Sequence, residues 1–370
     1  MLDIDRMWDA VSLHDVRFLA YPFLFYIDPY RSIFSGTLLH FFGPNRILLR
    51  LPSILFSIGT YWFLVYVFIK EKINPWIIAL SLLAFTVSGI TINDRSGGGD
   101  AQTRFFILVA GYYLWQAFRY TVLRNVQFAL LAWTFGLLTM LDAVVLFPAL
   151  VYAFWKRQGV KHKKTLILAG GIAFLLTCYF TLWIVLPYIA FKDGYQHYLS
   201  NRGLFYYFSV AKSGSTRDSF SSINWFIHYT SIFFVLWTGG TAIATFWIKK
   251  LRILQLITIP AWIAILLLRD ASFHVIMYAG LFLLQAMLVT NYFLEKFPKT
   301  KYIIIFFLSA VAIANAYNLF TQYSDVYQFN PHRKTMPHKT AHCLDESVIR
   351  IYQIHHSYPL NKSCTYPRVQ

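Results

Sequence analysis

The chain has 370 residues, of which 57% are hydrophobic and only 13% are charged, and its formal net charge is +17. A soluble globular protein needs more polar surface than this, so most of the chain is expected to face lipid or other apolar helices. The basic residues are spread along the sequence rather than gathered in one polar domain, which argues against a nucleic-acid-binding protein.

A regular hydropathy pattern begins at Leu51 and continues to residue 320. Because most of its apolar runs are long enough to cross a bilayer, it predicts about ten membrane spans. The expected fold is all-α, a polytopic membrane helical bundle, and the short runs 127–142 and 144–155 are expected to form a helical hairpin. The predicted spans are 51–69, 74–92, 105–122, 127–142, 144–155, 165–190, 223–248, 253–268, 272–293 and 302–320.

Polar segments flank the predicted spans. Residues 1–50 mix charges, aromatic residues and prolines, and 32–43 are predicted to form an interfacial or re-entrant helix. We expect 1–322 to be one transmembrane domain and 323–370 to be a C-terminal extramembrane tail. Three cysteines are too few for a disulfide scaffold, although Cys343 and Cys364 in the tail are candidates for one bridge.

Basic residues between the spans form five clusters that alternate with less basic loops. By the positive-inside rule these clusters are expected to be cytoplasmic. Residues 1–50, the 93–104 loop and the 191–222 loop then face the other side. This topology requires either that residues 1–50 are translocated by themselves or that a further helix lies upstream of Met1, and the second is the favoured expectation. The clusters are Lys70 and Lys72; Arg119 and Arg124; Lys156, Arg157, Lys161, Lys163 and Lys164; Lys249, Lys250 and Arg252; and Lys296, Lys299 and Lys301.

The loop 93–104 is the main candidate for a functional site. Its two acids and two arginines lie between apolar runs, and charge beside hydrocarbon usually binds or reacts with something. Its three adjacent glycines allow the backbone to approach a ligand closely. The structural alternative is that Asp100 caps a helix starting near Gln102 and that the arginines pair with the acids. The four candidates are Asp94, Arg95, Asp100 and Arg104.

A D-x-D sequence, Asp3-Ile4-Asp5, lies on the same predicted face. This spacing lets two carboxylates share a divalent cation, since hard cations prefer oxygen ligands. A solvated chain terminus can carry the same pattern without any function, so the residues alone leave both interpretations open.

Two more groups lie near predicted outer boundaries. Arg269 and His274 flank the start of a span, where a guanidinium binds phosphate well but can also pair with Asp270. Asp142 lies near the end of a short span, and an acid within the membrane is a functional candidate.

Four stretches occur in order within residues 1–155. They are Asp28-Pro29 with the amphipathic run to Phe42-Gly43; Leu49-Arg50-Leu51-Pro52-Ser53; Asp100-Ala101-Gln102-Thr103-Arg104; and Leu137-Leu138-Thr139 through Phe147-Pro148. Their order and spacing resemble the membrane glycosyltransferases of the GT-C type, above all the protein O-mannosyltransferases and the bacterial aminoarabinose transferases that modify lipid A. The chain departs from the family at Ile27-Asp28-Pro29, where many members have His-Pro-Pro.

The resemblance implies a jaw helix in the first outer loop, a first family helix upstream of Met1, and a catalytic acid ahead of the proline segment. Asp5 is the expected general base, with Asp3 as the alternative. The Arg269 to His274 region resembles a late motif near the carrier phosphate. The expected donor-phosphate and substrate-binding residues are Asp94, Arg95, Asp100, Arg104, Arg269 and His274.

The expected reaction moves a sugar, mannose or another hexose, from a polyprenyl-phosphate donor to a hydroxyl of a protein or glycolipid. It takes place on the non-cytoplasmic face of a multi-pass protein, in the cell inner membrane or the endoplasmic reticulum. No cofactor is certain, and a divalent cation is an open option; membrane lipids are expected partners and nucleic acid is not. The alternatives are a polytopic transporter or lipid-sugar flippase, although no Walker A motif for an ATP-driven pump is present, and a non-catalytic membrane scaffold.

Overall fold

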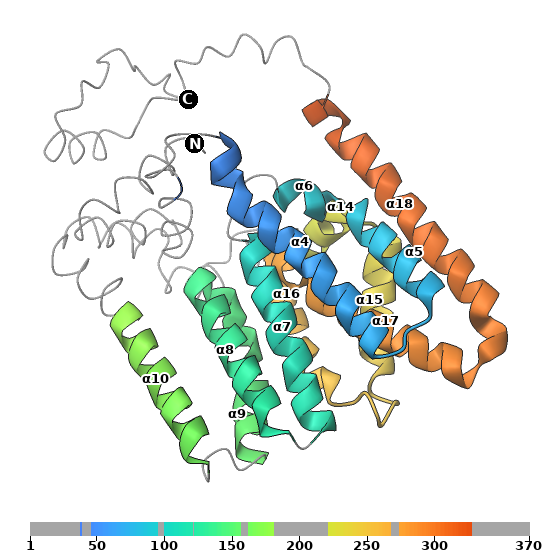
Figure 1. The fold of residues 1–370 in the computed structure, drawn as a ribbon. Coiled ribbons are helices and arrows are strands. Elements are labelled where there is room, and N and C mark those ends of the chain that lie inside the picture. The colour runs from blue at the N-terminus through green and yellow to red at the C-terminus, as the bar shows by residue number, and fades with distance from the viewer. Residues whose placement is uncertain are drawn as a thin grey trace, which may run out of the picture.

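A computed structural model describes Leu38 and residues 46–94, 100–120, 122–156, 162–180, 221–267 and 274–327. Within these ranges the chain is helical and contains no strand, in agreement with the predicted all-α class (Figure 1). The predictions for Asp3, Asp5, the tail cysteines and, apart from Leu38, the jaw helix fall outside these residues. Of the predicted 191–222 loop only residues 221 and 222 are described, and they belong to a helix.

The first described helices are α4 (Arg46–Lys70), α5 (Pro75–Thr86), α6 (Gly89–Asn93) and α7 (Asp100–Arg119). The side chain of Asn74 accepts a hydrogen bond from the Trp76 amide and Pro75 occupies the first turn, so α5 begins with a strong N-terminal signal. The predicted span 74–92 is two helices rather than one, because a turn at Val87 and Ser88 interrupts the helix.

Side-chain hydroxyls hold that break in place. Ser88 Oγ donates to the Phe85 carbonyl at 2.6 Å, and Thr91 Oγ1 donates to the Thr86 carbonyl at 3.0 Å. These bonds satisfy carbonyls that the end of α5 leaves without helical partners. The turn therefore directs α6 toward the residues that precede the glycine-rich loop.

The next elements are α8 (Leu123–Thr139), the 3-10 helix η3 (Leu141–Leu146), α9 (Phe147–Lys156) and α10 (Lys163–Phe180). In the segment predicted as a hairpin, η3 joins α8 to α9. Trp133 Nε1 donates to the Ala143 carbonyl at 2.8 Å and so ties this turn to α8.

The remaining elements are α14 (Ser221–Tyr229), α15 (Ile232–Ala244), α16 (Leu254–Leu267), α17 (His274–Lys296), η6 (Pro298–Thr300) and α18 (Lys301–Tyr327). The predicted span 223–248 is again two helices, since Ser231 interrupts it and caps α15 by accepting from the Phe234 amide at 3.2 Å. Helix α18 continues five residues beyond the predicted domain boundary at residue 322.

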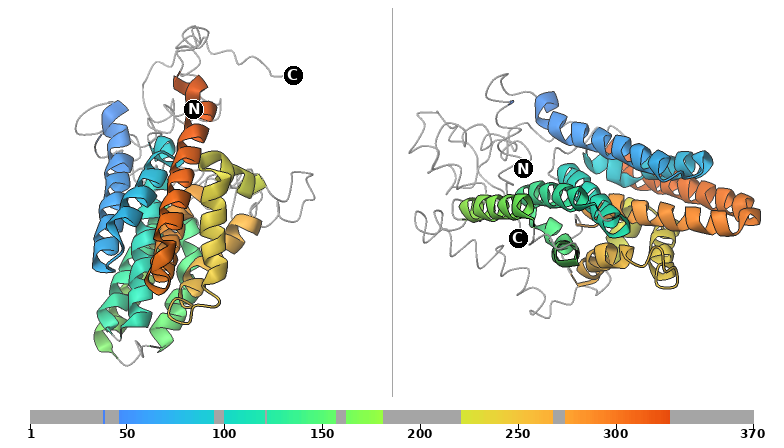
Figure 2. Two further views of the ribbon diagram at one scale, coloured as in Figure 1. Left: turned by 90° about the vertical axis from the view of Figure 1, so that its right-hand side faces the viewer. Right: turned by 60° about the horizontal axis from the view of Figure 1, so that its bottom comes forward.

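Helix α17 lies in the centre of the bundle and α7 packs along it. Their contact is close at Gly111, where an added methyl group would meet Leu281 Cδ1 at 2.5 Å. On another side of α17, the rings of Phe282 and Trp262 stack with centroids 4.3 Å apart. Figure 2 shows from two further directions that α4, α7, α17 and α18 run roughly along a common axis.

Three helical segments are long and apolar enough to cross a membrane: Arg50–Lys70, Ile276–Lys296 and Pro298–Thr321. Three further apolar helices are shorter, at Pro75–Thr86, Ile232–Ala244 and Leu254–Leu266. The described helices thus support the membrane character of the chain. They support the predicted number of spans only in part. Helix α7 is not among the spans because its first turns carry polar and charged side chains.

The basic clusters within the described chain lie at helix ends that gather at one end of the bundle, the lower end in Figure 1. These ends are the α4–α5, α7–α8, α9–α10, α15–α16 and α17–α18 connections. The end of α6 and the start of α7 lie at the opposite end. This is the separation that the alternation of charged loops predicts.

Candidate functional site

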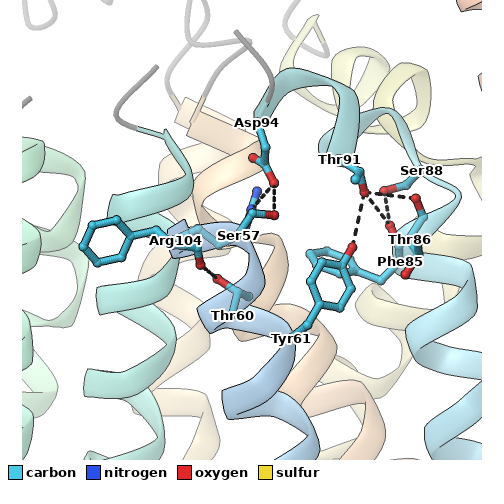
Figure 3. A network of polar contacts seen from close by, with 10 residues as sticks. Ser57, Thr60, Tyr61, Phe85, Thr86, Ser88, Thr91, Asp94 and Arg104 are labelled. Carbon is cyan, nitrogen blue, oxygen red and sulfur yellow. Dashed lines mark hydrogen bonds and ion pairs between the residues drawn. The ribbon is translucent and has the colours of Figure 1, made fainter. Parts of the chain in front are cut away.

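A buried ion pair joins Asp94 to Arg104 where α6 ends and α7 begins. Arg104 Nη2 lies 2.5 Å from Asp94 Oδ2, and the two side chains are 0% and 5% exposed. Ser57 Oγ, from α4, donates to the same carboxylate oxygen at 2.6 Å (Figure 3). Three separate helical segments therefore converge on one carboxylate.

The polar turn after α5 positions Asp94. Thr91 in α6 bonds carbonyls at the end of α5, and its hydroxyl also lies 3.3 Å from the Tyr61 hydroxyl in α4. Figure 3 shows this network beside the Asp94 carboxylate. Because α6 is anchored to both α4 and α5, Asp94 at its end is held over the first turns of α7.

Arg104 is positioned by close packing. Its guanidinium carbon lies 5.7 Å from the centre of the Phe85 ring, and its Cγ would lie 3.3 Å from a methyl group added at Gly280. A side chain at position 280 would therefore require Arg104 to shift, and glycine allows α17 to approach it this closely. Helix α17 thus packs against the aliphatic part of Arg104, whereas Phe85 of α5 and the Asp94 carboxylate lie next to its guanidinium group.

The pair leaves hydrogen-bonding capacity unused. Among the described residues, Arg104 Nε and Nη1 and Asp94 Oδ1 are buried and have no hydrogen-bond partner. An arginine stays charged at any working pH, and an unsatisfied buried polar group costs roughly 1–3 kcal/mol. The free donors of Arg104 therefore suit an anion with several acceptor oxygens, such as a phosphate.

Asp100 belongs to the same neighbourhood. Helix α7 starts at Asp100 itself, whereas the capping alternative had the helix starting near Gln102. A carboxylate in the first turn is favourable next to the positive end of the helix dipole. Its charge also acts on Arg104 and on Tyr229 of α14. The structure thus brings together Asp94, Asp100 and Arg104, three of the predicted site residues.

A second buried acid, Asp142, lies in η3. The Tyr278 hydroxyl of α17 is 3.2 Å from the Asp142 carbonyl oxygen and 3.3 Å from its Oδ1. Thr103 of α7 donates to Thr139 at 2.9 Å, which ties the end of α8 to the residue next to Arg104. The Tyr278 hydroxyl therefore fixes η3 to α17, and the Thr103 hydroxyl fixes the preceding end of α8 to α7.

The sequence interpretation missed two residues of these sites, Ser57 and Tyr278. Ser53, Ser57 and Thr60 recur at helical spacing on one face of α4, and all three are buried. A polar stripe on an apolar helix needs partners, so this spacing was a usable signal. Tyr278 carried no comparable signal, because an aromatic residue in an apolar helix is ordinary.

The other predicted residues remain untested by this geometry. Asp3, Asp5, Arg95 and Arg269 lie outside the described residues, and for His274 only its place at the start of α17 is described. Among the described residues no group of three or more histidine, cysteine or acidic side chains is arranged to hold a metal ion. A divalent cation thus remains an expectation from the sequence.

Comparison of the chain with models of known families, with curated proteins and with solved structures gave no match.

Proposed function

We propose that the protein is a multi-pass membrane glycosyltransferase with about ten spans. It moves a sugar, mannose or a related hexose, from a polyprenyl-phosphate donor to a hydroxyl of a protein or glycolipid acceptor. The reaction takes place on the non-cytoplasmic face. The observation that carries this proposal is Arg104, a fully buried cation whose Nε and Nη1 have no protein partner among the described residues.

Arg104 supports a phosphate site for three reasons. It holds a permanent positive charge, it has donors left after pairing with Asp94, and it lies one turn into α7. A helix N-terminus adds unpaired amides and a positive dipole end, and both favour an anion. The apolar surroundings strengthen this attraction because water does not screen it.

In the proposed step the acceptor oxygen attacks the anomeric carbon as the bond from that carbon to the phosphate oxygen breaks. The acceptor proton passes to a carboxylate, for which Asp5 is the proposed base and Asp3 the alternative. Negative charge develops on the departing phosphate, where Arg104 stabilises it. Arg95, Asp100, Arg269 and His274 are proposed to complete the donor site. One displacement without a covalent intermediate inverts the configuration at the sugar.

The test uses purified full-length protein with radiolabelled polyprenyl-phosphate mannose and polyprenyl-phosphate glucose. A serine- and threonine-containing peptide and a lipid A preparation serve as acceptors. We expect label to reach one acceptor, polyprenyl phosphate to be released, and Asp5→Asn to abolish both while leaving expression and thermal stability near wild type. Full activity of Asp5→Asn removes Asp5 as the base.

A transporter or lipid-sugar flippase also needs a buried cation for the carrier phosphate, and the Asp94–Arg104 pair suits that role as well. The same radiolabelled polyprenyl-phosphate sugars distinguish a flippase from a transferase. In sealed vesicles a flippase changes the side on which the labelled donor is found and leaves its sugar–phosphate bond intact. Donor translocation without cleavage therefore contradicts the transferase proposal.

A further inference from the structure

Lys72 has an unusual backbone conformation. Among the described non-glycine residues it alone has a positive φ, at 56°. It follows the end of α4, where its amide bonds the Ile69 carbonyl at 3.0 Å and the Ile73 amide bonds the Phe68 carbonyl at 2.9 Å. This is the Schellman arrangement, in which the left-handed position is normally glycine. A lysine there is strained, which raises the question of what its side chain contributes.

The one acid next to Lys72 is turned away from solvent. Glu71 accepts hydrogen bonds from Gln116 Nε2 at 2.6 Å and from Tyr112, and it forms an ion pair with Arg119. Its side chain is only 7% exposed, whereas that of Arg119 is 47% exposed. The Glu71 carboxylate is therefore satisfied within the protein, whereas Lys70 and Lys72 on either side of it in the chain are exposed.

Lys70 stands on the other side of Glu71. Its Nζ lies 3.4 Å from the Tyr66 hydroxyl and 5.7 Å from the centre of the Tyr112 ring, and its side chain is exposed. Lys72 is also exposed, and no carboxylate of the described chain forms an ion pair with it. We call Lys70, Lys72 and Arg119 the basic corner.

Exposed aromatic side chains surround the basic corner. Tyr66, Trp76 and Tyr120 each expose close to half of their surface or more. Aromatic residues with one polar atom favour the boundary between the hydrocarbon and the headgroups of a membrane. Exposed aromatic residues next to cations are therefore the composition expected where a helix end meets lipid headgroups.

We propose that the basic corner is a docking site for the headgroup phosphate of an anionic membrane phospholipid. Two exposed ammonium groups and a partly exposed guanidinium complement that charge, and the strained Lys72 is retained because its ammonium group contacts the lipid. The site lies at the opposite end of α4 and α7 from Asp94 and Arg104 (Figure 1), so it does not depend on the proposed sugar transfer.

The test separates lipid binding from structure through Lys72→Gly. Full-length protein in detergent is offered phosphatidylglycerol or phosphatidylcholine, retained lipids are counted by native mass spectrometry, and Tm is measured in parallel. Glycine fits the left-handed position, so Tm without added lipid rises. Loss of the ammonium group lowers phosphatidylglycerol retention roughly fivefold. A purely structural lysine cannot produce these opposite changes.

Two matched variants and one soluble probe complete the design. Lys72→Arg keeps the charge and retains phosphatidylglycerol, whereas Lys299→Gln removes an exposed charge at another loop of the same end and leaves retention unchanged. Unchanged retention in Lys72→Gly, or an equal loss in Lys299→Gln, overturns the proposal. A Tm gain from inorganic phosphate equal to that from phosphatidylglycerol also overturns it, since the site then binds free anions.

Discussion

Asp94 Oδ2 accepts hydrogen bonds from both Arg104 Nη2, at 2.5 Å, and Ser57 Oγ, at 2.6 Å. The ion pair links residues ten positions apart across the glycine-rich stretch of the candidate loop. Both donors bond to Oδ2, so Asp94 Oδ1 and Arg104 Nε and Nη1 have no hydrogen-bond partner among the described residues. It therefore contributes to the stability of the fold and also retains donors for a ligand.

Asp94→Asn is expected to be strongly destabilising. It removes the carboxylate that is paired with the buried Arg104 guanidinium, and breaking a buried ion pair in this way costs about 3–5 kcal/mol. The measurement is thermal unfolding of the purified protein in detergent. The control is Lys299→Gln, because Lys299 is exposed and belongs to neither of the ion pairs of the described residues, so its loss is expected to leave the Tm nearly unchanged.

The double variant Asp94→Asn with Arg104→Met distinguishes stability from function. Asparagine can still accept from Ser57, and methionine fills the space of the aliphatic chain without a charge. We expect most of the lost stability to return. Binding of polyprenyl phosphate, measured with a fluorescent or radiolabelled form of it, is expected to be lost. Retained binding in a folded double variant would show that Arg104 is not the phosphate ligand.

Gly280→Ala tests the close approach of α17 to Arg104. Replacing glycine by alanine in an exposed helix normally stabilises that helix by about 1 kcal/mol. At Gly280 the new methyl group would meet Arg104 Cγ at 3.3 Å, whereas at Gly171 in α10 it would meet nothing within 4 Å. We therefore expect Gly171→Ala to raise Tm, and Gly280→Ala to raise it less or to lower it. Equal gains would mean that Arg104 shifts without cost.

The sequence predicted the charged loop and offered pairing of its arginines with its acids as an alternative, but it did not specify which acid pairs with Arg104. Helical spacing alone favours Asp100 as the partner of Arg104, because the two are four residues apart on α7. The structure pairs Arg104 with Asp94 instead. That choice depends on the break after α5, which turns α6 so that Asp94 lies over α7, and no local pattern specifies such an arrangement.

Hydropathy located the helices well and their breaks poorly. It treats 74–92 and 223–248 as continuous, since both runs stay apolar across Ser88 and Ser231. In each case a serine hydroxyl bonds the backbone and replaces a helical hydrogen bond. Average hydropathy is insensitive to a single hydroxyl, so the sequence predicted the all-α class but did not locate these two interruptions.

Tyr278→Phe measures the anchor of the η3 turn. Phenylalanine keeps the ring and removes the hydroxyl that lies 3.2 Å from the Asp142 carbonyl oxygen and 3.3 Å from its Oδ1. Loss of a buried hydrogen bond of this kind costs about 1 kcal/mol. Tyr302→Phe, on a tyrosine that is 80% exposed, should leave Tm unchanged. Equal Tm values for both variants would show that Tyr278 does not hold the turn.

Asn315 links three helices and gives the sharpest test of the C-terminal half of the fold. Its Oδ1 accepts from Ser231 at 2.5 Å and its Nδ2 donates to the Ala84 carbonyl at 2.7 Å, so α18 is bound to both α15 and α5. Asn315→Leu removes both bonds and leaves the Ser231 hydroxyl with one fewer partner.

Interhelical hydrogen bonds in membrane proteins contribute about 0.6–2 kcal/mol each, so the expected cost of Asn315→Leu is roughly 1–3 kcal/mol. Ile313→Leu, on a side chain exposed at the outer face of α18, provides the matched control. The readout is the midpoint of thermal unfolding in detergent, together with protease sensitivity of the α17–α18 connection. If Asn315→Leu is as stable as Ile313→Leu, α18 is held by apolar packing alone and the asparagine bridge is incidental.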